Sequence, residues 1–277
     1  MTLGGLSPVE AAGLVSALLI GGLVVGFLSG LIGIGGGGIL VPVLYELFRL
    51  MEVPEEVRMH MAVGTSLAVI TPTSIRSFLS HRARGAVDEE VLWRLGPAVM
   101  AGVGLGVLIA HRAPGDLLKL VFAVFCAVMA LRLIVGSDRL KIAAELPGPA
   151  VCWPAGLFIG GYCALIGIGG GAFVTTFMQL HGRPILKAVA TAAGFGPIIA
   201  LPGTIGYIWA GLGAEGLPPG SAGFVSVLGA LIIVPASVLA APAGVRLAHG
   251  LSRRTLEYAF AAFLIAVGIR FTIALVG

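Results

Sequence analysis

Long apolar stretches without charge are the feature that most constrains this chain. The segment 11–31, for example, contains no Asp, Glu, Lys or Arg. A membrane-spanning helix needs about 20 mostly apolar residues. In all, 58% of the residues are hydrophobic and 11% are charged, with a mean hydropathy of +1.06, whereas soluble domains carry roughly 25% charged residues. Because the apolar runs are long and do not alternate, the sequence predicts an all-α polytopic membrane protein.

A seven-residue motif occurs twice in the chain. Residues 31–37 and residues 165–171 both read LIGIGGG. The later stretches 62–65 and 188–191 read AVGT and AVAT, and in a third matching stretch Arg132 aligns with Arg270. Three motifs recur in the same order, which indicates an internal repeat. We therefore predict a single transmembrane domain over 1–277, built from repeat one (1–140) and repeat two (145–277).

Each repeat is expected to contain about five helical segments. The expected segments are 11–31, 37–50, 61–79, 92–110 and 117–136 in repeat one, and 150–166, 171–181, 186–210, 222–246 and 255–275 in repeat two. The second segment of each repeat is too short to cross a bilayer comfortably at 1.5 Å per residue. It follows a glycine run, which a helix does not readily continue through. We interpret each GIGGG as an interruption of the helix within the membrane.

Basic residues predict the orientation of the chain. The connections 76–94, 132–145, 181–187 and 246–254 hold 12 of the 17 Lys and Arg residues, and the positive-inside rule makes them cytoplasmic. Both termini and the loop around Glu215 are then expected outside. Corresponding loops of the two repeats fall on opposite sides, which predicts inverted topology. Inverted repeats with interrupted helices are typical of secondary transporters whose site lies near the midplane.

These motifs resemble those of the TauE/SafE family of sulfite and organosulfonate exporters. The repeated LIGIGGG and the AVGTS stretch at 62–66 carry the resemblance, which covers nearly the whole chain. It implies a multi-pass permease of the cell inner (plasma) membrane that moves a small sulfur-containing anion outward; some members handle other small organic anions. Carried over by motif, the expected substrate-binding residues are Gly33, Gly35, Gly36, Gly37, Thr65, Ser66, Gly167, Gly169, Gly170, Gly171 and Thr191. Repeat two has Ala192 where repeat one has Ser66.

The glycine motifs suit an anion for a physical reason. Glycine lets a ligand approach backbone N–H groups, and a helix N-terminus offers unpaired donors with a partial positive charge. Gly37 and Gly171 each stand at the start of a short helix. The competing interpretation is helix packing, because small residues also line membrane helix contacts. Likewise, Thr65 and Ser66 could donate to an oxyanion or bond within their own helix.

Further residues extend the site hypothesis toward its mouth. Arg76 at the inner end of its segment, and Thr175 and Gln179 on the second short helix, are candidate gate or mouth residues. No Asp or Glu is expected deep inside an apolar segment, which agrees with an anionic substrate. The sequence shows no nucleophile–base pair, metal-ligand set or basic arm, so we expect no enzyme activity, metal, cofactor or nucleic acid partner. A passive anion channel, a carrier of small carboxylates and a homodimer stay open.

Overall fold

The fold is a bundle of helices, shown in a computed structural model that describes residues 8–32, 37–135, 146–249 and 252–276. The predicted Gly33, Gly35 and Gly36 lie outside the described residues. The helices are α1 (Pro8–Ile32), α2 (Gly37–Leu50), α3 (Glu55–Ala83), α4 (Glu89–Arg112), α5 (Gly115–Val135), α6 (Pro149–Ile166), α7 (Gly171–Leu180), α8 (Ile185–Ala210), α9 (Val227–His249) and α10 (Arg253–Val276). Two short strands, β1 (Ser221–Ala222) and β2 (Val225–Ser226), pair as an antiparallel hairpin.

The ten predicted segments are confirmed, most of them within three residues at each end. The two largest differences have physical reasons. Helix α3 begins at Glu55 instead of residue 61, because Pro54 precedes it and two glutamates in its first turn favour the positive end of the helix. Helix α9 begins at Val227 instead of residue 222, because residues 221–226 form the unpredicted hairpin.

The composition of the helices confirms the polytopic membrane fold. Within the described residues, six helices are long and apolar enough to cross a membrane: α4, α5, α6, α8, α9 and α10. Large apolar side chains lie exposed on their outer faces, including Leu120, Val128 and Leu131 on α5. Such surface is stable when it contacts lipid tails. The short helix α7 has ten residues, which is about 15 Å of helix and half of a hydrocarbon core.

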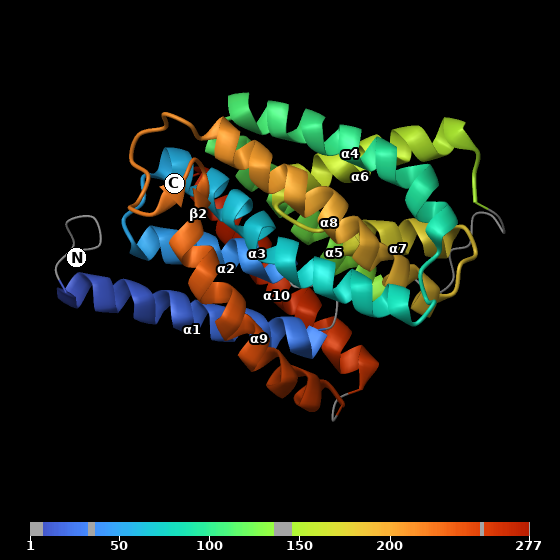
Figure 1. The fold of residues 1–277 in the computed structure, drawn as a ribbon. Helices are drawn as coiled ribbons and strands as arrows, with labels where there is room; N and C mark the ends of the chain where they lie inside the picture. Colours follow the sequence, from blue (N-terminus) through green and yellow to red (C-terminus); the bar gives the residue numbers. More distant parts are fainter. Residues whose placement is uncertain (1–7, 33–36, 136–145, 250–251, 277) are drawn as a thin grey trace.

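The helices pack in four long pairs that Figure 1 shows running along the bundle. Helix α1 packs on α9, α4 on α6, α3 on α8, and α5 on α10. The short helices α2 and α7 pack on α3 and α8 respectively. Backbones approach closely at glycines, for instance where Gly26 meets Ser237 and where Gly160 meets Val99. Small residues therefore do serve helix packing in this protein.

The connections gather at two opposite ends of the bundle. The β1–β2 hairpin and the α2–α3 connection lie at one end, and α10 finishes there (Figure 1). The α3–α4 and α7–α8 connections lie at the other end. The second pair of connections belongs to the set that the charge count places in the cytoplasm.

Candidate functional site

The second LIGIGGG motif is a break between two helices. Helix α6 ends at Ile166, and Gly167 follows it with a φ of 70°. Gly170 precedes α7 with a φ of 77°. Both angles lie in the left-handed region, which glycine adopts without steric cost. The predicted interruption is thus confirmed for this motif, while of the first motif's predicted glycines the structure describes Gly37, the first residue of α2.

The break is tightly packed except at its last glycine. We compared what a Cβ atom would meet at each position. The packed glycines and their nearest neighbours are Gly167 with Val41 and Val63, Gly169 with Ile70 and Gly196, and Gly170 with Ile199. A Cβ on Gly171 would meet no heavy atom within 4 Å in the described part of the chain. A side chain at Gly171, the first residue of α7, would therefore have room, and the first N–H groups of this helix have no partners within the helix.

Ser66 supports this break from another helix. Its Oγ donates a 2.8 Å hydrogen bond to the carbonyl oxygen of Gly167, and the Ser66 side chain is buried. The bond satisfies one of the carbonyls that the end of α6 leaves without a helical partner. Repeat two has Ala192 at the matching position, so that position has no hydroxyl to give. Ser66 thus stands beside the predicted site and holds its backbone.

Thr65 and Thr191 each accept a hydrogen bond from a backbone N–H just before a long helix. The Asp88 N–H, just before α4, donates to Thr191 Oγ1 on α8 at 2.8 Å. The Ser226 N–H, just before α9, donates to Thr65 Oγ1 on α3 at 2.9 Å. Both threonines are fully buried. Each hydroxyl therefore holds the start of a long helix that belongs to the opposite half.

The short helix α7 is tied to α5 through a cation. Arg132 Nη1 donates to Thr176 Oγ1, and Arg132 Nη2 lies 3.5 Å from Gln179 Oε1. The predicted mouth residue Gln179 is therefore an arginine partner, and Thr175 lies half-buried on the same helix. The third predicted mouth residue, Arg76, is exposed on α3. In the part of the chain that the structure describes, no hydrogen bond joins Arg76 to Thr175 or Gln179.

A second arginine makes the corresponding contact with α2. Arg270 Nε on α10 lies 3.0 Å from Glu46 Oε1 on α2, and Arg49 Nε lies 2.6 Å from Glu46 Oε2. Arg132 and Arg270 are the residues that the repeat aligns. Glu46 lies about one turn before the end of the segment 37–50 and its side chain is partly exposed, so it is not an acidic residue deep inside an apolar segment. The carboxylate is tolerated there because two guanidinium groups neutralise it.

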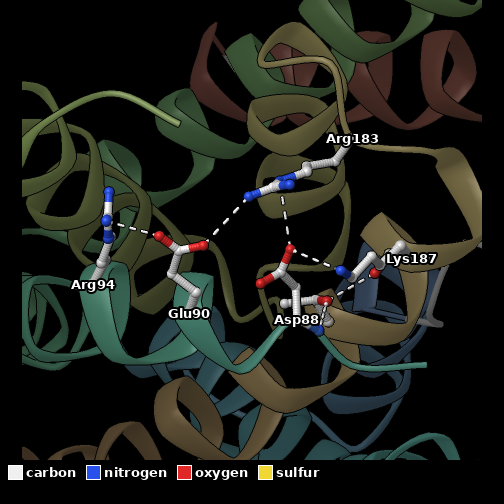
Figure 2. Close-up of polar contacts among 6 residues, drawn as sticks. Asp88, Glu90, Arg94, Arg183 and Lys187 are labelled. Carbon is white, nitrogen blue, oxygen red and sulfur yellow. Dashed lines mark hydrogen bonds and ion pairs between the residues drawn. The ribbon is translucent and has the colours of Figure 1, made fainter. Parts of the chain in front are cut away.

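A cluster of charges joins the α3–α4 connection to the α7–α8 connection, and sequence reasoning missed it. Figure 2 shows Asp88 between Arg183 and Lys187, with Glu90 between Arg183 and Arg94. Asp88 Oδ2 lies 3.4 Å from Arg183 Nε and 3.3 Å from Lys187 Nζ. Glu90 lies 3.5 Å from Arg183 Nη2 and 2.7 Å from Arg94 Nη2. We call Asp88, Glu90, Arg94, Arg183 and Lys187 the Asp88 cluster.

The opposite end of the bundle carries a smaller charge cluster. Lys119 Nζ lies 2.5 Å from Glu55 Oε1 and 3.0 Å from Asp116 Oδ1. The Lys119 side chain is 1% exposed, so its charge depends on these two partners. The hydrogen bond from Lys119 lowers the pKa of the Glu55 carboxyl below its ordinary value. This cluster fixes the start of α5 to the start of α3.

A bundle of apolar helices of membrane-spanning length, interrupted at a glycine break, defines a multi-pass membrane protein. Residues 18–271 match the sequence model of the family described as "Sulfite exporter TauE/SafE". The chain belongs to this TauE/SafE family, which is a family of membrane transporters and not of enzymes.

Named relatives agree with the family assignment. A probable membrane transporter protein of Haemophilus influenzae is 31% identical over 91% of this chain and 95% of its own length. A probable membrane transporter protein of Methanocaldococcus jannaschii is 27% identical over 92% of this chain and 94% of its own. The sulfite exporter TauE/SafE family protein 5 of Arabidopsis thaliana is 32% identical over 42% of this chain and 26% of its own.

Proposed function

We propose that this protein is a secondary transporter that exports a small sulfur oxyanion, sulfite or an organosulfonate, by alternating access. The single observation that carries the proposal is the open space at Gly171. Gly171, the first residue of a ten-residue helix, borders that space and has no side chain to fill it. Exposed N–H donors and the positive end of the helix dipole favour a small anion there. Gly167, Gly169 and Gly170 shape the break, and Ser66 holds it.

The proposal also takes the two halves as inverted repeats, with the site between them. In such a repeat, α1 to α5 correspond to α6 to α10 in the same order. If each helix is replaced by its counterpart, the α1–α9 pair becomes α6–α4 and the α2–α3 pair becomes α7–α8. The α3–α8 and α5–α10 pairs stay the same. All of these pairs pack together. The matched bonds of Thr65 and Thr191, and the matched contacts of Arg270 and Arg132, follow the same exchange. By this symmetry we assign Gly37, at the start of α2, to the site as the partner of Gly171.

Two further parts of the proposal concern the roles of side chains and the orientation. We assign Thr65 and Thr191 to positioning the helices around the site, because their hydroxyls accept backbone N–H groups. We place the Asp88 cluster on the cytoplasmic side and both termini outside the plasma membrane, on the charge count. Opposite topology between the halves then lets one site face the two sides in turn.

The test is flux through purified protein in liposomes. The panel pairs sulfite and methanesulfonate with acetate and a neutral sulfone of similar size. Gly171→Leu fills the open space, and Gly104→Leu is the matched control, since a Cβ at Gly104 on α4 also meets nothing within 4 Å. We expect saturable flux of the sulfur anions that Gly171→Leu abolishes and Gly104→Leu preserves. Faster flux of acetate than of the sulfur anions would show that the substrate is a carboxylate. Flux without saturation would indicate a channel. Unchanged flux in Gly171→Leu would show that the site is not at Gly171.

A further inference from the structure

The Asp88 cluster lies at the end of a packed seam that leads from the glycine break. Along α8, Gly196 contacts Gly169 of the break and also Ser74 of α3. Two residues earlier, Gly194 contacts Phe78 of α3 and Leu92 of α4. One turn further on, Thr191 holds the backbone of Asp88. From the break to this end of the bundle, α8 is therefore in contact with α3, with α4 and with the residue that precedes α4.

The central ion pairs of the cluster are close but lack directional bonds. In the part of the chain that the structure describes, neither Asp88 Oδ2 nor Arg183 Nε has a hydrogen-bond partner, although both atoms are buried. A buried carboxylate is costly unless it is both paired and hydrogen-bonded. The attraction to Arg183 and Lys187 holds Asp88 in place, and a ligand that hydrogen-bonds the same cations would compete with it.

Among the described residues, no ion pair occurs at the matching place at the other end. There Ser226 stands where Asp88 stands, and its backbone N–H bonds to Thr65 in the same way. The backbone bond is thus common to both ends, while the charges of Asp88, Arg183 and Lys187 are added at one end only. The charge network joins the two halves at one end, where the backbone bond already holds the start of α4. Such a network could therefore form and break as the protein changes between two arrangements.

We propose that the Asp88 cluster is an anion-operated gate: an oxyanion binds Arg183 and Lys187 in place of Asp88, and the α3–α4 connection then separates from α8. The proposal rests on the proposed function for the site that the gate serves and for the cytoplasmic side it faces. The ligand class is a small oxyanion with at least two acceptor oxygens, such as a sulfonate. Binding at the gate favours the open state because the anion has no place on the cations in the closed one.

The experiment measures access to the break and does not depend on transport. Gly171→Cys introduces a thiol where the structure has room for it, and the parent chain, whose three cysteines are buried, gives the background. A membrane-impermeant maleimide is applied to each face of oriented vesicles. Labelling rates are compared with methanesulfonate and with chloride at equal ionic strength, so that screening of the ion pairs is the same. Sulfite is avoided because it consumes maleimide.

Three gate variants and one matched control are compared in the Gly171→Cys chain. Asp88→Asn removes the charge and keeps the shape, while Arg183→Gln and Lys187→Gln remove the cations. Arg82→Gln is the control, because the Arg82–Glu89 pair spans 3.0 Å at the same end but joins α3 to α4 within one half, and both side chains are over half exposed. An open state that is normally populated at no more than about 10% allows a rise of about tenfold or more in the labelling rate.

The expected pattern is specific to a gate. Methanesulfonate speeds labelling of the chain with the intact cluster, Asp88→Asn labels about tenfold faster without any anion, and Arg183→Gln no longer responds to methanesulfonate. Arg82→Gln behaves as the intact chain. If the maleimide labelled the thiol only from the face opposite to the proposed cytoplasmic one, the gate would still be supported and the proposed orientation would be reversed. Equal rates for Asp88→Asn and the intact cluster, or no response to methanesulfonate, would overturn the gate even if flux of sulfur anions were shown separately.

Discussion

Ser66 on α3 donates its hydroxyl hydrogen to the carbonyl oxygen of Gly167, 101 residues later, at 2.8 Å. This bond joins the helix of one half to the glycine break of the other. Both atoms lie in the buried centre of the bundle, where a carbonyl that loses its donor is not rescued by bulk water. The glycine break is therefore held at its Gly167 carbonyl by a helix outside it.

We expect Ser66→Ala to destabilise the protein by about 1–3 kcal/mol, because the Gly167 carbonyl loses its buried partner. Ser74→Ala is the control, since Ser74 Oγ donates to Thr71 O within the same helix. The measurement is thermal unfolding in detergent, followed by flux in liposomes. Equal unfolding temperatures for the two variants would show that the bond to Gly167 contributes nothing.

Thr65 and Thr191 allow a test of the proposed internal repeat. Thr65→Val and Thr191→Val each leave one buried backbone N–H without its acceptor, so each should cost about 1–3 kcal/mol of stability. Thr204→Val is the control, because Thr204 Oγ1 donates to Ala200 O within α8. Chemical unfolding in detergent gives the comparison. If only one of the two losses exceeds that of the control, the positions are not equivalent in the two halves.

Arg270 and Arg49 contact the same carboxylate, Glu46, from different places. Arg270→Gln should lower flux about tenfold or more, because a short helix displaced by 1 Å loses much of its alignment with a bound ligand. Arg49→Gln, three residues from Glu46 on the same helix, should change flux little. The measurement compares the Michaelis–Menten parameters of sulfonate flux between Arg270→Gln and Arg49→Gln. Similar kinetics for both variants would mean that Arg270 does not position α2.

Arg132 is expected to act on α7 as Arg270 acts on α2. Arg132→Gln removes the donors to Thr176 and Gln179 and should raise the KM for a sulfonate with a smaller effect on protein yield. Arg132→Lys keeps the charge but loses the planar, two-pronged geometry, so it should restore flux only in part. Full restoration by lysine would show that the charge alone matters, and an unchanged KM in Arg132→Gln would contradict the positioning role.

Acid should weaken the Lys119 cluster. The pKa of Glu55 is lowered by its hydrogen bond from Lys119, so its stabilisation is complete above the unfolded pKa of about 4.3 and is lost as the pH falls through the lower folded pKa. Glu55→Gln removes this contribution, and its unfolding temperature should therefore fall less than that of the natural chain between pH 6 and pH 3. Glu56→Gln, an exposed neighbour on α3, is the control. Parallel pH curves for Glu55→Gln and the natural chain would contradict the linkage.

The helices and the interruptions follow from local sequence. Apolar runs of membrane length must satisfy their own backbone groups, so they form helices wherever the run continues. Proline and glycine then place the ends, as they do at Pro54 and at Gly167 and Gly170. The first short helix covers 37–50, as expected from the position of its glycine run. The β1–β2 hairpin was missed because its two-residue strands give no alternating pattern.

The partners of the polar side chains could not be read from the sequence. Thr65 and Thr191 carry the repeat signal in the sequence, yet which backbone N–H each one accepts depends on where α4 and α9 begin in space. Asp88 and Arg183 are 95 positions apart, and a lone Asp before a helix reads as an ordinary cap. The sequence shows Glu46 three residues before Arg49, but its ion pair with Arg270 joins residues that are far apart in the sequence.

The membrane environment, the helical segments, the break at the second glycine motif and the family all follow from the sequence alone, because each of these depends on composition or on a contiguous motif. The tertiary structure decided which glycines are packed and which one opens onto space, which hydroxyls hold backbone, and which charges meet across the halves. Such contacts join residues tens to hundreds of positions apart. Their energies depend on distances of a few ångströms that only the packing of helices sets.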